Sequence, residues 1–342
     1  MKKILLLLML SAPAILVSAQ DNRVLYLTKS LASDKIKTVF VNTSGGSIAV
    51  SGAEGQEPRV EVYINGNNNQ SLTKEEIKSR IDELYTLDIS VHDGELHATA
   101  KQKRSNMNWR RSLSIAFKVY VNERTATNLN TSGGSISLVS LTGNQNFETS
   151  GGSINVNDVT GIIKGETSGG SINVSNSKQD IDLETSGGSI NASNCSGNIR
   201  LETSGGSLRL QNLKGTIKAT TSGGSVNGNN ISGELTTGTS GGSVNLMAIS
   251  GSLDASTSAG SLHVQMLQVG KFVKLDSSAG HVDLELPTKQ GLTLDVRGDR
   301  VTLDMDGTFD GSKEKERVAG KLNGGGPTVE VRGDSRVSVT TK

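Results

Sequence analysis

The chain has 342 residues, a formal net charge of +1 and a charged fraction of 20%, and nothing in this balance suggests a nucleic-acid partner or a polybasic membrane surface. Aromatic residues make up only 3%, which argues against a conventional globular core and against sugar-stacking platforms. The 41 glycines fall at fixed offsets and accompany only 4 prolines, so the chain is neither a disordered linker nor collagen. The single cysteine, Cys195, excludes an internal disulfide framework.

Residues 1–19 have the pattern of a signal peptide. Lys2 and Lys3 precede an apolar run over residues 4–17, and Val17-Ser18-Ala19 fits the small-residue cleavage rule. No cysteine lies near this site, which excludes a lipid anchor of the bacterial lipoprotein type. No later stretch has the roughly 20 apolar residues of a transmembrane anchor. We therefore expect an exported protein, in the periplasm or at the cell surface.

Residues 20–130 predict irregular rungs with one helix and a basic loop. Strands are expected over residues 37–41, over 59–64, over 87–100 and over 112–121. Thr73 and Glu76 form a capping box, and Ile77 and Ile81 follow at helical spacing, so a short amphipathic helix is expected over 74–85. This helix either covers an open end of the fold or docks a partner. The basic loop, residues 101–111, contains Trp109, the only tryptophan.

Residues 131–290 consist of one repeat. The sequence Thr-Ser-Gly-Gly-Ser followed by an apolar residue begins, with a constant 18-residue period, at Thr131, Thr149, Thr167, Thr185, Thr203, Thr221 and Thr239. Variants with Ser-Ala-Gly follow at Thr257 and, after a two-residue slip, at Ser277, and an isolated early copy begins at Thr43. Self-similarity at one fixed period predicts a solenoid.

Each 18-residue unit predicts two short strands and two turns. Ile172 and Val174 alternate with polar residues after the turn, and Ile181 and Leu183 do so before the next turn. A second glycine column marks the other corner: Gly143, Gly161, Gly197, Gly215, Gly233 and Gly251, with Gln179 as the exception. The fold class expected is all-β, a single-stranded β-helix (β-solenoid) with an 18-residue rung, right-handed as parallel β-connections usually are.

Residues 291–342 predict degenerate terminal rungs. Alternating residues over 292–305 and 329–339 surround two Arg-Gly-Asp triplets, at Arg297 and Arg332, which have the composition of turns rather than of an integrin-binding site. Residues 313–317 are a solvated charge run in a loop between the two segments.

The Thr-Ser-Gly-Gly-Ser-Ile repeats behind a signal peptide, closed by Asn-Gly-Gly-Gly-Pro-Thr at residues 323–328, resemble the bacterial "putative adhesin" family. This is a domain-of-unknown-function family of single-stranded β-helices, related to the head domains called putative auto-transporter adhesins. The resemblance covers roughly residues 37–340. It implies the fold and an adhesive role, and it brings no catalytic residues.

Three polar columns recur at the repeat spacing: Glu148, Glu166, Glu184 and Glu202; Asn155, Asn173, Asn191, Asn227 and Asn245; and Asn176, Asn194, Asn212 and Asn230. Stacked glutamates repel, so Lys164, Arg200 and Lys218 are expected to offset them on a solvated face. The amide columns predict hydrogen-bonded ladders. The alternative is a surface-binding stripe of the four glutamates with Asn155, Asn173 and Asn191, binding a partner or calcium. The calcium-binding nonapeptide of β-roll proteins is absent.

The sequence predicts no catalytic, cofactor-binding or metal-binding residue. The four histidines lack metal-ligand spacing, and Cys195 falls in a column of buried aliphatic residues. The function expected is that of an exported structural or adhesion module of the bacterial cell envelope, binding a protein or glycan component through a regular polar surface. A periplasmic envelope scaffold or sensor, binding through residues 65–111, is the alternative. A carbohydrate-active β-helix enzyme is disfavoured because the regular rungs have no insertions to build a cleft.

Overall fold

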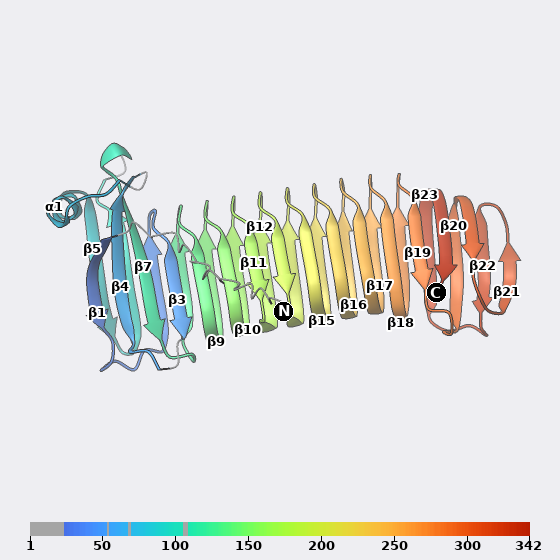
Figure 1. The fold of residues 1–342 in the computed structure, drawn as a ribbon, viewed down its shortest axis with the longest axis horizontal. Helices are drawn as coiled ribbons and strands as arrows, with labels where there is room; N and C mark the ends of the chain where they lie inside the picture. Colours follow the sequence, from blue (N-terminus) through green and yellow to red (C-terminus); the bar gives the residue numbers. More distant parts are fainter. Residues whose placement is uncertain (1–23, 53–54, 68–69, 105–108) are drawn as a thin grey trace, which may run out of the picture.

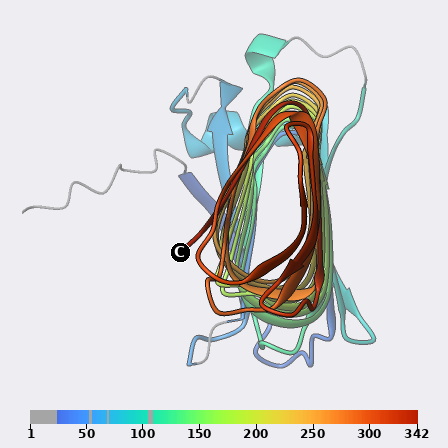
Figure 2. The ribbon, with the colours of Figure 1, turned by 90° about the vertical axis from the view of Figure 1, so that its right-hand side faces the viewer.

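The computed structural model describes residues 24–52, 55–67, 70–104 and 109–342, and the predicted signal peptide lies outside them. The chain forms a long rod of stacked rungs (Figure 1). Viewed along the rod, the rungs superpose as a narrow closed outline with two long sides (Figure 2). The described residues contain no helix that is both long enough and apolar enough to cross a membrane.

The N-terminal part contains the helix and the first strands: β1 (Val24–Ser30), β2 (Thr38–Thr43), β3 (Ile48–Gly52), β4 (Arg59–Gly66), α1 (Lys74–Leu84), β5 (Tyr85–His92), β6 (Glu95–Gln102), the 3₁₀ turn η2 (Trp109–Arg111), β7 (Leu113–Val121) and β8 (Ala126–Thr131). The regular part contains β9 (Ile136–Thr149), β10 (Ile154–Thr167), β11 (Ile172–Ser175), β12 (Lys178–Thr185), β13 (Ile190–Ser193), β14 (Ser196–Thr203), β15 (Leu208–Thr221), β16 (Val226–Thr239), β17 (Val244–Thr257) and β18 (Leu262–Ser277). The C-terminal part contains β19 (Val282–Leu286), β20 (Leu292–Asp304), β21 (Phe309–Lys313), β22 (Arg317–Leu322) and β23 (Thr328–Thr341).

Each rung contributes one strand segment to each long side of the rod. We call face A the side formed by segments that follow the Thr-Ser-Gly-Gly-Ser turn, such as β11, and face B the side formed by segments that precede it, such as β12. In the regular part from β9 to β17, neighbouring segments pair in parallel with one repeat of 18 residues between partners, for example Ile172 with Ile190 on face A and Ile181 with Ile199 on face B. The predicted 18-residue β-solenoid is confirmed.

The corner between the two segments requires a left-handed backbone at two columns. Residues such as Asn176 and Asn194 have φ near +55°, and the predicted glycine column has φ between +117° and +138° from Gly143 to Gly251. Gln179, the one exception in that column, has φ +84°. Glycine recurs because it adopts these angles without steric cost, and asparagine recurs because its side chain tolerates them.

The threonine that opens each turn is buried and fully engaged. Thr185 Oγ1 donates to the carbonyl of Gly170 on the preceding rung, at 2.8 Å, and accepts from the amide of Gly188, at 3.2 Å. Equivalent bonds recur from Thr149 to Thr257. These bonds satisfy backbone groups that the turn would otherwise bury without a partner.

The early Thr-Ser-Gly-Gly-Ser copy is part of the regular stack. Thr131 Oγ1 donates to the carbonyl of Gly46 at 2.9 Å, β2 pairs with β8 and β3 pairs with β9. The copy at Thr43 is therefore isolated in the sequence alone, because residues 53–125 form an insertion within its rung, and it stacks in register with the regular copies instead of forming an irregular rung.

The insertion extends both faces towards the N-terminal end of the rod. On face A, β7 pairs with β3, and β4 and β1 then add antiparallel. The strand expected over residues 59–64 is confirmed as β4, but it is an antiparallel addition to the sheet rather than an irregular rung. On face B, β6 pairs with β2 and β5 adds antiparallel. The strand expected over 87–100 is thus a hairpin, because Asp93 and Gly94 both have positive φ and turn the chain.

The predicted helix is confirmed as α1. Thr73 and Glu76 make both bonds of the capping box, and Ile77 and Ile81 are buried in the core. Figure 1 shows α1 at the N-terminal end of the rod, a position that fits the first of its two expected roles, that of a cover; the docking of a partner stays a prediction.

The C-terminal strands stack out of sequence order. β23 lies between β18 and β20 on face B, and between β19 and β20 on face A. Arg297 and Gly298 pair with Arg332 and Gly333, and Gly333 pairs with Ser277, which opens the last turn variant. The two triplets expected as turns lie within the assigned strands β20 and β23, where the chain passes from face B to face A. The hairpin of β21 and β22 was not predicted, and the charge run of residues 313–317 spans its tip.

Candidate functional site

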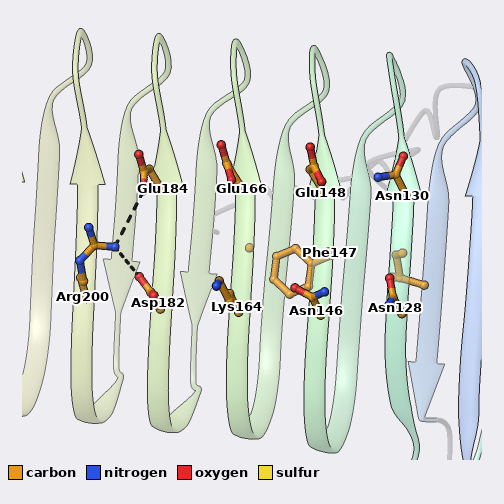
Figure 3. Close-up of a pocket in the computed structure, with 12 residues that line it drawn as sticks. Asn128, Asn130, Asn146, Phe147, Glu148, Lys164, Glu166, Asp182, Glu184 and Arg200 are labelled. Carbon is orange, nitrogen blue, oxygen red and sulfur yellow. Dashed lines mark hydrogen bonds and ion pairs between the residues drawn. The ribbon is translucent and has the colours of Figure 1, made fainter.

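The principal candidate site is a hollow on the outer surface of face B. It has a volume of about 390 Å³ and crosses five consecutive rungs (Figure 3). Its lining residues are Asn128, Leu129, Asn130, Asn146, Phe147, Glu148, Lys164, Gly165, Glu166, Asp182, Glu184 and Arg200. Most of them are polar side chains that alternate with the inward residues of β8, β9, β10, β12 and β14. The hollow is therefore an open trough along the rod rather than an enclosed pocket.

Phe147 and Gly165 shape the floor of this hollow. Both belong to the inward column that holds Leu129, Leu183 and Leu201 on neighbouring rungs. A Cβ atom on Gly165 would lie 1.9 Å from the ring of Phe147, so the ring occupies the space of the missing side chain. Figure 3 shows the ring directed along the rod towards the next rung. The sequence signal was a phenylalanine followed, one repeat later, by a glycine in a leucine column, and it was missed.

Arg200 is the cation that the structure pairs with the glutamate column. Its guanidinium lies 2.8 Å from Asp182 Oδ1 and 3.8 Å from Glu184 Oε2, and it also donates to Glu202. The hydrogen bond to Asp182, together with the nearby carboxylates, raises the pKa of Arg200. These side chains are about half exposed, so each pair stabilises the fold little. Within the described part of the chain, the expected ion pairs at Lys164 and Lys218 are not formed.

The asparagines form the predicted ladders. On face A, Asn173 Nδ2 donates to Asn155 Oδ1 at 3.0 Å, and Asn191 donates to Asn173 at 2.9 Å. At the corner, the column from Asn176 to Asn230 makes the same bond between rungs at 2.8–3.2 Å. The amides therefore bind one another along the rod, and each keeps only part of its hydrogen-bonding capacity for a ligand.

The candidate stripe is divided between two surfaces. Glu148, Glu166, Glu184 and Glu202 lie on face B, whereas Asn155, Asn173 and Asn191 lie on face A. The turn between Thr185 and Ser189 carries the chain from one face to the other, so Glu184 on β12 and Asn191 on β13 belong to opposite sides of the rod. Only the glutamates contribute to the hollow, so the two sets do not share one ligand-sized site.

The insertion carries outward aromatic groups that the sequence interpretation overlooked. Arg59 lies 3.9 Å from the ring centre of Tyr120, and Lys118 lies 4.5 Å from that of Tyr63. Glu61 accepts hydrogen bonds from Arg59 and Tyr63 at 2.7 and 2.9 Å. Burial raises the pKa of Glu61, but these hydrogen bonds outweigh it, so the pKa lies below its ordinary value. The contacts arise because β4 and β7 are antiparallel neighbours, which was not predicted.

The described residues contain no group of three or more ligating side chains that could hold a metal ion. His263 lies 2.9 Å from Asp283, and its ring meets that of His281 edge-on at 6.4 Å. Cys195 is buried as expected, and burial raises the pKa of its thiol, which makes it a poor nucleophile.

Comparison with known proteins places this geometry in context. Residues 178–335 match the family described as Toastrack DUF4097. A comparison with curated proteins found no match.

Among solved structures, the chain is similar to a "putative adhesin" from Parabacteroides distasonis ATCC 8503, with 15% identity, 75% of this chain and 96% of that chain covered, and a TM-score of 0.43. It is also similar to a "putative adhesin" from Bacteroides fragilis NCTC 9343, with 13% identity, the same coverages and a TM-score of 0.38. A "putative cell adhesion protein" from Clostridium sporogenes ATCC 15579 has 14% identity, coverages of 92% and 98%, and a TM-score of 0.20.

Proposed function

We propose that this protein is an exported, non-enzymatic adhesion module of the bacterial cell envelope, and that it binds an extended polar ligand along face B. The observation that carries the proposal is the hollow that crosses five rungs. An open trough with regularly spaced polar side chains fits a chain-like ligand, such as an envelope glycan, better than a small molecule, which prefers an enclosed and largely apolar pocket.

The charges along the trough support a polar ligand. One outward column carries Asn146, Lys164, Asp182 and Arg200 on successive rungs, and the next carries the glutamates. Rungs are about 4.8 Å apart, so hydrogen-bond donors and acceptors recur at that regular spacing along the trough. Because the pairs are exposed, a ligand can replace them at little cost.

The non-enzymatic part of the proposal is supported by the connections between rungs. From β9 to β17 the rungs follow one another through the short turn, with no loop in this stretch that could wall a cleft. A glycoside hydrolase needs two carboxyl groups facing each other across a bound sugar. Here the glutamates lie in one row on one surface. Release of reducing sugars from envelope polysaccharides by the purified chain would contradict this part.

The binding test compares variants of the two faces. Arg200→Ala changes the trough, and Arg209→Ala, an exposed arginine on face A, is the matched control. Binding of the purified chain to isolated peptidoglycan and to envelope polysaccharides is measured with each variant. We expect Arg200→Ala to weaken binding and Arg209→Ala to leave it unchanged. An equal loss in both variants, or no binding to any fraction by the unchanged chain, would contradict a ligand on face B.

A periplasmic scaffold or sensor is the second candidate. It is favoured by helix α1 and the basic loop after β6, which lie at the N-terminal end of the rod and leave both faces free. Protease accessibility on intact and lysed cells distinguishes the two. Cleavage on intact cells supports adhesion, and protection until lysis supports the scaffold or sensor.

A further inference from the structure

The N-terminal end of the rod holds a concentrated positive charge around an exposed tryptophan. Residues 96–122 contain no aspartate or glutamate, and the part of this run from the end of β6 to the start of β7 contains Lys101, Lys103, Arg104, Arg110 and Arg111. Trp109 is 57% exposed, the largest value among the large apolar side chains of the described residues. The net charge of +1 for the whole chain conceals this local concentration.

The structure fixes this loop to α1. The amide of Lys103 donates to the carbonyl of Leu84 at 2.9 Å, and its Nζ donates to the carbonyl of Asp82 at 2.6 Å. On the other side of the loop, Arg111 makes a two-pronged contact with Glu83 at 2.6 and 2.9 Å. The last turn of α1 therefore holds both ends of the loop.

The backbone of Trp109 is also held while its side chain is exposed. Its carbonyl accepts from Asn67 Nδ2 at 3.0 Å and from the amide of Ser112 at 3.2 Å. Arg110 lies 5.7 Å from the indole centre. Figures 1 and 2 show η2 standing beyond the outline of the stacked rungs. An exposed indole on a backbone held by two hydrogen bonds is available for contact without being ordered first.

We propose that Trp109 and the surrounding basic residues dock the N-terminal end of the rod onto an anionic phospholipid membrane surface. Tryptophan favours the interfacial region of a bilayer because its ring is apolar and its N–H is polar. Lysine and arginine beside it are attracted to anionic headgroups. Arg111 is paired with Glu83, and Lys101, Lys103, Arg104 and Arg110 add to the positive charge around the indole.

The chain contains a single tryptophan, so the indole emission reports on this site alone. This matters because residues 4–17 are apolar and could carry the full chain to vesicles by themselves. The full chain is titrated with mixed phosphatidylglycerol–phosphatidylethanolamine vesicles, with phosphatidylcholine vesicles, and with soluble polyphosphate. We expect a shift of emission to shorter wavelength with the anionic vesicles only, and its loss in high salt.

Charge-reversal variants complete the test. The variant Arg104→Glu with Arg110→Glu keeps Trp109 and is expected to need at least about tenfold more anionic lipid for the same shift. The control, Lys271→Glu with Lys274→Glu, makes the same charge change at exposed positions far along the rod and is expected to match the unchanged chain. Circular dichroism verifies that both variants are folded. No shift with anionic vesicles, or an equal shift with phosphatidylcholine, overturns the proposal. An equal shift with polyphosphate assigns the site to a soluble polyanion and overturns the membrane.

Discussion

The two glycines of each Thr-Ser-Gly-Gly-Ser turn have different constraints. A Cβ atom on the second glycine, Gly188, would lie 2.0 Å from the carbonyl oxygen of Gly170 on the preceding rung. A Cβ atom on the first glycine, Gly187, would have nothing closer than 3.5 Å. The chain already varies the first position, because Ala259 and Ala279 occupy it, whereas Gly260 and Gly280 retain the second. Close stacking of backbones explains the second glycine.

This difference predicts opposite results for two neighbouring substitutions. Gly188→Ala is expected to destabilise the protein by more than about 3 kcal/mol, because the contacted backbone belongs to an adjacent rung and cannot move away. Gly187→Ala is expected to leave stability unchanged or to raise it by up to about 1 kcal/mol, by restricting the unfolded chain. Denaturant midpoints from circular dichroism measure both. Similar losses in the two variants would show that the stacking contact does not decide the requirement.

At the scale of single residues, the sequence predicted that both glycines of the Thr-Ser-Gly-Gly-Ser turn recur, but not why each of them is required. The periodic pattern shows that Gly187 and Gly188 recur, while the distance between rungs that distinguishes them exists only in the folded stack. The amide ladders were predictable because the recurrence of Asn155, Asn173 and Asn191 already requires them to stack.

At the scale of elements, β9 and β10 compensate for each other in the core. Phe147 on β9 fills the space that the absent side chain of Gly165 leaves on β10, and the next rungs return to Leu183 and Leu201. A large residue beside a small one keeps the packing density constant along the rod. The two positions should therefore be energetically coupled.

A double-mutant cycle tests this coupling. Gly165→Leu alone is expected to cost about 3 kcal/mol through overlap with the phenyl ring, and Phe147→Leu alone about 1–2 kcal/mol through the cavity it leaves. The double variant restores the leucine column and is expected to be more stable than Gly165→Leu. Combining Phe147→Leu with the remote Leu275→Ala should instead give additive losses of unfolding free energy. Additivity in the first pair would disprove the compensation.

The carboxylate of Asp295 joins strands β20 and β22 in the C-terminal part of the rod. Asp295 on β20 accepts hydrogen bonds from Arg297, at 3.0 and 3.3 Å, and from Arg317 on β22, at 3.2 Å. These bonds, with that from Arg297 the largest cause, lower the pKa of Asp295. Since the folded pKa lies below the unfolded value of about 3.9, the stabilisation is complete above that value and is lost as the pH falls through the folded pKa.

This predicts acid-induced opening of the hairpin of β21 and β22. Hydrogen exchange of the hairpin amides should reveal weaker protection as the pH falls below about 4, once the intrinsic pH dependence of exchange is removed. Asp295→Asn should weaken protection at neutral pH, by up to about 1 kcal/mol, and should remove this part of the acid dependence. Asp306→Asn removes a charge at an exposed position in the same C-terminal part of the rod and is the control. An unchanged acid dependence in Asp295→Asn would assign the effect to other carboxylates.

The elements that sequence predicted well are those whose signals are local. The capping box at Thr73 predicted α1, and period-2 alternation predicted the strands of every regular rung. The hairpin of β5 and β6 also had a signal, since the apolar positions change phase across Asp93-Gly94, from Leu87, Ile89 and Val91 to Leu96, Ala98 and Ala100. The position of β23 had none. β20 and β23 both carry Arg-Gly-Asp and similar alternation, so their order in the stack depends on long-range pairing.

At the scale of the molecule, the rod is a one-dimensional stack in which each rung contacts its neighbours. The register stays at one repeat per rung from β9 to β17 and changes only at β18, where Val244 pairs with Leu262 but Thr257 pairs with Ser277. The two-residue slip predicted from sequence is thereby confirmed and absorbed by bulges. The hollow on face B could not be predicted from the repeat period. Its position depends on which columns of side chains the turns bring together on one face, and the period alone does not give that arrangement.

A stack with constant register should tolerate the removal of whole rungs. Deletion of residues 186–221, which is two whole repeats, joins Thr185 to Ser222 and restores an intact Thr-Ser-Gly-Gly-Ser turn. β12 would then stack on the face B segment of β16, with every inward residue still inward. We expect a folded rod that is about 10 Å shorter, because rungs are about 4.8 Å apart.

Deletion of residues 187–221, one residue fewer, is the matched control. It displaces all following rungs by one position and turns their apolar residues outward, since side chains alternate with a period of two. Small-angle scattering measures the maximum dimension, and circular dichroism measures the β content of both variants. If both deletions fold equally well, the rungs do not depend on register. If neither folds, stability depends on contacts that reach beyond neighbouring rungs, because the two-rung deletion preserves every nearest-neighbour relation of the regular stack.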